Sequence, residues 1–173
     1  MLRAVLKTAR LVLRPVNAAD LPHLIRLKAD PQVFAVMLGG VRQAWQTVEE
    51  LARDIQFWGE TGAGMWSAYE DGKFQGLIGL HRRPDGLGIA LRLGVWPEAR
   101  GRGLAREGAC AALRYAHDVA GIERIIAVAR ADNFASRMVL GGIGMVEVSS
   151  YVAEGRVMLL YDSLRPPDDP EFR

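Results

Sequence analysis

The chain has 173 residues, half of them hydrophobic and 24% charged, a composition that suits one soluble globular domain. The formal net charge of +2 is too small to favour a nucleic-acid-binding protein, and no uncharged apolar run reaches membrane-spanning length, so neither nucleic acid nor a membrane is an expected partner. The single cysteine, Cys110, excludes an internal disulfide and agrees with a cytoplasmic location.

The first part of the chain is expected to form a strand followed by a helix. Residues 9–16 alternate as a strand does, and Pro15 limits this strand to an edge or an end. Asn17 and Asp20 have the spacing of a capping box, which predicts a helix that starts there and stops before Pro31.

The next segment, residues 31–44, leaves two interpretations open: a lid that faces a substrate, or a short helix with a loop. Thr47 and Glu50 again have capping-box spacing. They predict a second helix, with Thr47 as its cap and its end within residues 59–64.

Three strands of an antiparallel meander are predicted next, over residues 65–69, 74–81 and 87–96. The first two are joined by Asp71-Gly72, a pair typical of tight hairpin turns. The second turn covers residues 82–86.

The stretch between Val95 and Arg106 joins the last of these strands to a helix. Gly101 and Gly103 leave its backbone N–H groups open to an anion, and a helix N-terminus adds unpaired donors with partial positive charge. The stretch also carries three arginines, Arg100, Arg102 and Arg106. It is predicted to bind a phosphate or pyrophosphate, with a plain solvated loop as the alternative. Neither G-x-x-x-x-G-K-[ST] nor G-x-G-x-x-G is present, so a nucleotide-binding fold is disfavoured.

The helix predicted over residues 104–120 presents small side chains to the sheet, which implies close packing. Its sheet-facing residues are Ala105, Ala109, Ala112, Leu113, Ala116 and Ala120. Cys110 is expected to be a buried core residue, and Gly121 to end the helix. The apolar strand 124–131 that follows should complete a right-handed parallel crossover with strand 87–96.

The remaining elements are a short helix over residues 135–140, which Asp132-Asn133 starts, and a hairpin of strands 145–152 and 157–161 around Glu154-Gly155. The whole order predicts an α/β fold: a three-layer sandwich with a mixed, mostly antiparallel sheet and a central parallel βαβ crossover. One domain is expected over residues 1–173, with its core at about 8–164 and a loose tail at 165–173.

Three segments resemble motifs of the GNAT superfamily of acetyl-CoA-dependent N-acyltransferases, in the branch that includes the RimJ/RimL ribosomal-protein N-terminal acetyltransferases. Residues 8–15 resemble its T-x-R-L-x-L-R-P, residues 97–105 its P-E-x-x-G-x-G-x-A, and residues 133–140 its N-x-A-S-x-x-V-L. The three motifs follow one another in the family's order, and the fold expected above is GNAT-like.

The resemblance implies acetyl-CoA as co-substrate and no metal. Backbone N–H groups from Arg100 to Arg106 would hold the CoA pyrophosphate. The strand before this loop would carry a bulge and splay from the next strand, so that pantetheine lies along residues 93–95 beside residues 127–129. The binding residues implied are Leu93, Val95, Arg100, Gly101, Arg102, Gly103, Leu104, Ala105, Arg106, Asn133 and Ser136.

Two of these residues are implied in catalysis. The backbone near Val95 would stabilise the oxyanion that develops on the thioester carbonyl, and Ser136 would donate a proton to the leaving thiolate. Asn133 would bond the pantetheine arm. Asn133 and Ser136 also have an alternative role, capping and opening a helix.

The strand before the loop departs from the branch, because Ala90 and Arg92 stand where an acidic residue is usual. Residues 141–145 depart as well, with G-G-I-G-M in place of E-K-L-G-F. His81 and Glu70 are candidates for a general base, although turn or surface roles suit both, and neither is assigned as catalytic.

The function implied is transfer of acetyl to a primary amine, either a protein N-terminus or a small molecule, by direct attack in a ternary complex. The alternative is a catalytically inactive CoA-binding sensor or assembly module, which the missing acidic residue motivates. The resemblance also allows a homodimer.

Overall fold

The structure, a computed structural model, describes residues 4–166. Its centre is an eight-stranded sheet in the order β1-β2-β3-β4-β5-β6-β8-β7. Among the described strands every neighbouring pair is antiparallel except β5 and β6, which are parallel. The strands are β1 Leu6–Lys7, β2 Val12–Pro15, β3 Met65–Glu70, β4 Lys73–Arg82, β5 Ile89–Val95, β6 Arg124–Arg130, β7 Val146–Ala153 and β8 Arg156–Leu164.

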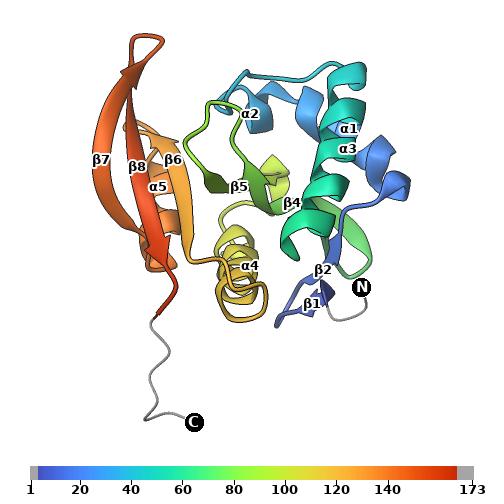
Figure 1. The fold of residues 1–173 in the computed structure, drawn as a ribbon. Coiled ribbons are helices and arrows are strands. Elements are labelled where there is room, and N and C mark those ends of the chain that lie inside the picture. The colour runs from blue at the N-terminus through green and yellow to red at the C-terminus, as the bar shows by residue number, and fades with distance from the viewer. Residues whose placement is uncertain (1–3, 167–173) are drawn as a thin grey trace, which may run out of the picture.

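Helices pack on both faces of this sheet. They are α1 Leu21–Ala29, α2 Pro31–Phe34, α3 Ala44–Thr61, α4 Leu104–Asp118 and α5 Phe134–Gly142, with 3₁₀ turns η2 Ala18–Asp20 and η3 Pro97–Ala99. Successive residues of β4 show the two faces: Leu77 packs in one apolar cluster with Phe34 of α2, and Ile78 in another with Ala109 of α4. The predicted three-layer α/β sandwich is confirmed, as is the parallel crossover β5-α4-β6 (Figure 1).

The close approach of α4 to the sheet follows from its small residues. Ala109, Ala112 and Ala116 are fully buried, and a methyl group added to Gly108 would lie 2.5 Å from Ile78 Cδ1. Cys110 is only half-buried, contrary to its expected core position, because it lies off the stripe that faces the sheet.

The start of α3 differs from the prediction. The helix begins at Ala44, three residues before Thr47, because Gln46 Oε1 accepts a hydrogen bond from Gln43 N over 2.8 Å and closes the first turn. Thr47 lies inside the helix, where its Oγ1 is buried without a hydrogen-bond partner among the described residues. Residues 31–44 form the short helix α2 and a loop, one of the two forms expected.

The N-terminal strand is shorter than predicted, and it pairs with the two-residue strand β1, which is too short to leave a pattern in the sequence. The capping box of Asn17 and Asp20 is confirmed, and the hairpin turns at Asp71-Gly72 and Glu154-Gly155 have positive φ at both residues, as type I′ turns require.

Residues 4–166 include no helix long and apolar enough to cross a membrane. In the same part of the chain, no group of three or more His, Cys, Asp and Glu side chains is placed to hold a metal ion. Of the predicted loose tail, Arg165 N donates to Glu123 O over 2.7 Å, and residues 167–173 lie outside the described part.

Candidate active site

Strands β5 and β6 pair at Ala90 and Ile126 and diverge beyond that point, as predicted (Figure 1). We call the unpaired stretch 92–95 of β5, with residues 127–129 of β6, the β5–β6 opening. The expected bulge is absent, since the β4–β5 register runs unbroken through all the described pairs. Gly76 explains this, because any side chain there would collide with Gly94 O at 2.2 Å, so the two strands keep close contact.

Two backbone N–H groups of β5 point into this opening. Trp96 N donates to Gln75 O over 2.9 Å, across the β4 side. In an antiparallel pair, residues that bond the partner alternate with residues whose N–H and C=O point away. Gly94 therefore directs its backbone groups to β4, and Leu93 and Val95 direct theirs to the β5–β6 opening.

The loop after β5 presents a row of unpaired donors. Gly101 and Gly103 have φ of +79° and +78°, a conformation that glycine adopts without strain. Gly103 is the N-cap of α4 and brings no side chain to the helix end. From Gly101 to Arg106, no backbone N–H has a hydrogen-bond acceptor among the described residues. The loop therefore combines free donors with the positive end of α4.

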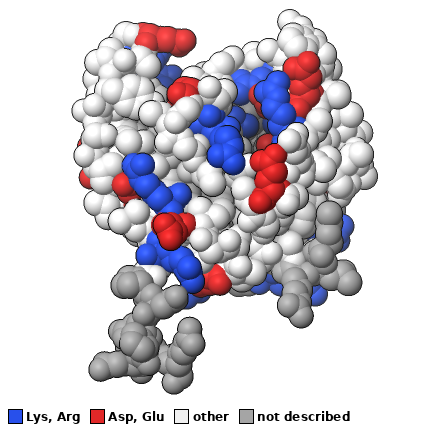
Figure 2. Space-filling model, in the orientation of Figure 1, with Lys and Arg blue, Asp and Glu red and all other residues white. Residues whose placement is uncertain are grey.

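The three arginines of this loop lie in different surroundings. Arg106 is exposed and makes no hydrogen bond or ion pair with another described residue, and Arg100 Nη2 donates to the carbonyl of Gln32 over 2.6 Å. Arg102 instead donates to both carboxylate oxygens of Glu70, over 2.9 and 2.8 Å. Figure 2 shows a similar pattern over one face, where Lys and Arg side chains lie beside Asp and Glu rather than in a uniform basic surface.

The N-terminal motif holds the loop in place. Arg10 Nη1 donates to Arg102 O over 2.6 Å, and its Nε donates to Glu107 Oε2 over 2.8 Å. Glu107, in the first turn of α4, also accepts from Thr8 Oγ1 and Arg10 N. Sequence reasoning noted Thr8 and Arg10 only as parts of a motif and missed this supporting role.

Asn133 and Ser136 lie at the start of α5, directly after β6. Asn133 Oδ1 accepts from Ser136 N over 3.2 Å, so the capping role is present. The amide nitrogen of Asn133 and the Oγ of Ser136 make no hydrogen bond with another described residue, and both side chains are partly exposed. These two groups are therefore free to contact a ligand.

A cluster of charged side chains lies between α1, α3 and β5, and sequence reasoning missed it as a cluster. Its members are Lys28, Arg42, Glu50, Asp54 and Arg92. Lys28 Nζ lies 2.6 Å from Glu50 Oε2, Arg42 Nε pairs with Glu50 Oε1, and Arg92 Nη1 is 3.8 Å from Glu50 Oε2. The one signal in the sequence was an arginine in the otherwise apolar strand β5.

The pKa values in this cluster follow its burial and charges. Burial raises the pKa of Asp54 to about 6, whereas Lys28 and the hydrogen bonds to Glu50 outweigh its burial and lower the pKa of Glu50 to about 2. Burial, with Arg92 next in effect, lowers the pKa of His81 to about 2. His81 is therefore neutral and a weak base at pH 7.

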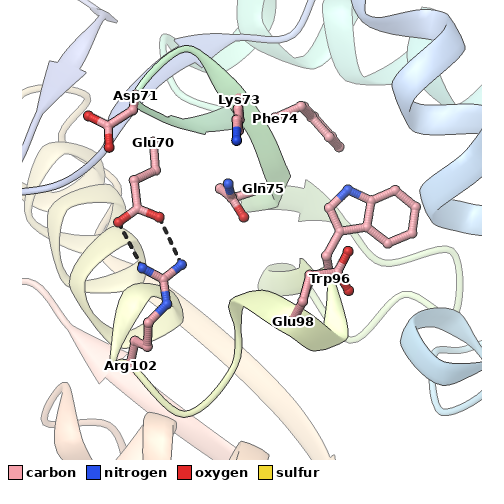
Figure 3. Close-up of a pocket in the computed structure, with 8 residues that line it drawn as sticks. All are labelled: Glu70, Asp71, Lys73, Phe74, Gln75, Trp96, Glu98 and Arg102. Atoms are coloured by element: carbon pink, nitrogen blue, oxygen red, sulfur yellow. Dashed lines mark hydrogen bonds and ion pairs between the residues drawn. The ribbon is translucent and has the colours of Figure 1, made fainter.

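Glu70 is also unsuited to act as a general base, because its hydrogen bonds with Arg102 lower the pKa of its carboxyl group. It lines an open pocket of about 480 Å³ together with Asp71, Lys73, Phe74, Gln75, Trp96, Glu98 and Arg102 (Figure 3). This pocket lies between the β3–β4 turn and the loop after β5, so it is on the β4 side of β5 and does not coincide with the β5–β6 opening.

Known proteins that are similar to this chain include several acetyltransferases. A protein 28% identical over 162 residues is the FsC-acetyl coenzyme A-N(2)-transacetylase of Aspergillus fumigatus; the match covers 84% of this chain and 66% of the fungal protein, just under two thirds of its length.

Solved structures with the same fold include an acetyltransferase from Agrobacterium tumefaciens, 25% identical with a TM-score of 0.80, covering 92% of this chain and 93% of that one. Another is RimL, an alpha-N-protein acetyltransferase of a ribosomal protein, in complex with coenzyme A. It is 17% identical with a TM-score of 0.75, covering 92% of this chain and 97% of that one, a likeness of fold.

The decisive comparison is with family models. The model of the acetyltransferase (GNAT) domain matches residues 10–146, a stretch that contains residues 10–15 of the N-terminal motif, the loop and both strands of the β5–β6 opening. The chain therefore belongs to the GNAT acetyltransferase family.

Proposed function

We propose that the protein transfers an acetyl group from acetyl-CoA to a primary amine by direct attack of the amine on the thioester. The observation that supports this most is the juxtaposition of the β5–β6 opening with the unpaired N–H groups of residues 101–106. The β5–β6 opening suits an extended thioester arm, and the N–H groups of residues 101–106 suit a pyrophosphate. The loop after β5 joins the two.

The pyrophosphate would accept hydrogen bonds from the backbone of residues 101–106 at the start of α4. Arg106 and Arg100 are the side chains placed to add charge, since neither is paired with a carboxylate among the described residues. Arg102 differs, because its guanidinium is held by Glu70. It would contribute its backbone N–H.

The pantetheine arm would lie in the β5–β6 opening, along Leu93 and Val95. An extended amide chain there can replace the missing strand-to-strand hydrogen bonds of β5. The N–H of Val95 would then donate to the thioester oxygen as negative charge develops on it. Asn133 follows the end of β6, on the other side of the opening. Its amide nitrogen is free and would donate to the pantetheine arm.

The reaction balances without a strong protein base. The amine, deprotonated through water, attacks the thioester carbon with its nitrogen. The carbon–sulfur bond breaks, Ser136 Oγ–H gives a proton to the thiolate sulfur, and Ser136 Oγ regains a proton from water. The proton that the amine nitrogen loses passes to water, since neither Glu70 nor His81 is a competent base. The products are an N-acetyl amide and CoA thiol.

The order of the three sequence motifs favours the branch that includes the RimJ/RimL N-terminal acetyltransferases of ribosomal proteins. Protein N-termini and small-molecule amines are both acceptor classes that we test. The single cysteine favours activity in the reducing cytoplasm. Light scattering of the purified protein tests the homodimer that the branch allows.

The experiment is release of free thiol from acetyl-CoA in the presence of a panel of amines and peptides. We expect turnover with at least one amine and only slow hydrolysis without it. Gly103→Glu should abolish acetyl-CoA binding, through charge repulsion and a side chain in the loop. Gly155→Glu is the matched control, since Gly155 has a similar φ of +72° in the distant β7–β8 turn. Tight acetyl-CoA binding without turnover on any amine would instead support a CoA-binding sensor.

A further inference from the structure

We infer that the acceptor of this enzyme is a small amine that also carries a carboxylate, and that Arg92, with His81 beside it, binds that carboxylate. The inference rests on the proposed acetyl transfer and adds to it the chemical class of the acceptor. It stands on the charged cluster between α1, α3 and β5.

Arg92 is a largely buried cation that has an ion-pair partner but no hydrogen-bond partner among the described residues. Its side chain is only 9% exposed, and its guanidinium makes no hydrogen bond with any described residue. The nearest carboxylate oxygen, on Glu50, is 3.8 Å away, beyond hydrogen-bond distance. Both Glu50 oxygens already accept from Lys28 and Arg42. A largely buried guanidinium that approaches its carboxylate only at this distance is stabilised if a further anion forms hydrogen bonds with it.

The cluster also has an excess of positive charge. Lys28, Arg42 and Arg92 are three cations, and Glu50 and Asp54 are two carboxylates, so the sum of the formal charges is +1. His81 is neutral and contributes N–H and N groups, and it makes no hydrogen bond with another described residue. A ligand with one negative charge would balance the cluster, whereas a doubly charged phosphate would exceed it.

The position of Arg92 fits the second substrate. Arg92 pairs with Gly79 of β4, which lies on the same face as Leu77, two residues earlier, and that face is covered by α1 and α2. Helix α4 lies on the other face, with Ile78. Because the two substrates of a direct transfer must meet at one carbonyl, a donor that enters from the α4 side leaves the Arg92 side for the acceptor.

His81 completes a pair of donors on this face. It pairs with Ala90, so it lies on the same face of the sheet as Arg92 and diagonally across from it. A guanidinium presents two parallel N–H groups that match the two oxygens of a carboxylate, and a neutral imidazole N–H can add a third hydrogen bond. Arg92 is also only three residues from Val95, where the thioester would sit, so a carboxylate held at Arg92 places a nearby amine within reach.

The test compares amino acids with their amides as acceptors. L-amino acids and β-alanine provide the carboxylate, their amides remove it, phosphoethanolamine supplies a phosphate, and spermidine supplies only cations. We expect kcat/KM for the acids to exceed that for the matched amides by about 30- to 1000-fold, because a buried charge pair is removed. Arg92→Met should reduce this ratio to near one, because it lowers kcat/KM for the acids far more than for the amides. Arg92→Lys should retain part of the ratio.

The matched control is Arg53→Gln, an exposed arginine of α3 that pairs with Glu49, which should leave the ratio unchanged. Circular dichroism and thermal melting establish that the Arg92 variants are folded. Preference for amides, phosphoethanolamine or spermidine in the wild type overturns the inference. So does an Arg92→Met variant that loses activity equally with acids and amides, since that result means a structural role.

A binding measurement distinguishes failure of this inference from failure of the proposed function. Saturation-transfer NMR measures contact of the same acids and amides with the protein–CoA complex, without turnover. Acids that bind the wild type but not Arg92→Met support the carboxylate site even if acetyl transfer fails. Equal binding of acids and amides overturns it even if acetyl transfer succeeds.

Discussion

Arg102 and Glu70 form a two-point ion pair, with Nη1 and Nη2 of the arginine 2.9 and 2.8 Å from the two carboxylate oxygens (Figure 3). The pair joins the loop before α4 to the end of β3, and it occupies the arginine at the centre of the proposed pyrophosphate site. Its side chains are partly exposed, so the pair is screened by salt and readily exchanged.

Glu70→Gln should therefore free Arg102 for the pyrophosphate. We expect acetyl-CoA to bind about two- to fivefold more tightly, with a steeper loss of affinity as salt is added. Calorimetric titration at two salt concentrations measures both effects. Asp71→Asn, a neighbouring change without a described ion pair, is the control. Weaker binding in Glu70→Gln would mean that the ion pair orders the loop for binding.

Arg10 should be required for the loop conformation. Arg10→Met removes the hydrogen bonds to Arg102 O and Glu107, and we expect an increase of about tenfold in the dissociation constant for acetyl-CoA with a loss of stability of about 1–2 kcal/mol. Arg114→Met, an exposed arginine later in α4, is the control. Unchanged affinity for acetyl-CoA would show that the loop holds its shape without Arg10.

His81 should make the protein less stable at acid pH. Its pKa is about 2 in the fold and about 6.5 unfolded, so the unfolded state takes up a proton that the folded state refuses. The stability contributed by the neutral form is fully present above pH 6.5 and is lost as the pH falls, by about 2 kcal/mol between pH 7 and pH 5.

Asp54 acts in the opposite direction, because its raised pKa of about 6 means that the folded state takes up its proton first on acidification. The comparison must therefore be between variants. His81→Gln should gain about 2 kcal/mol relative to the wild type between pH 7 and pH 5 in urea unfolding. A constant difference across this range would show that His81 titrates normally.

Ser136→Ala tests the proton donor. We expect kcat to fall about tenfold, less than is usual for a general acid because a thiolate is already a good leaving group, while acetyl-CoA affinity changes less than kcat. Ser150→Ala, on the exposed strand β7, is the control. A kcat equal to that of the wild type would limit Ser136 to its place in the first turn of α5.

Much of the fold could be predicted because its signals are local. The type I′ turns at Asp71-Gly72 and Glu154-Gly155, the Asn17 cap and the alanine face of α4 depend on residues within a few positions of one another. Where a local signal competed with a neighbour, the prediction was wrong: Thr47 has capping-box spacing, yet Gln43 and Gln46 close the helix earlier and leave Thr47 inside it.

The sequence by itself determined the proposed anion site, because two glycines at the start of a helix expose the same backbone donors wherever that helix lies. Only the tertiary structure decided which of its arginines are free, since Glu70 is 32 residues from Arg102 and meets it through strand pairing. The tertiary structure also decided the surroundings of Arg92. In the sequence, Arg92 is only a departure from the acidic residue usual in the RimJ/RimL branch. In the fold it becomes a largely buried cation that shares Glu50 with two other cations, because α1 and α3 bring Lys28, Glu50 and Asp54 to the same place.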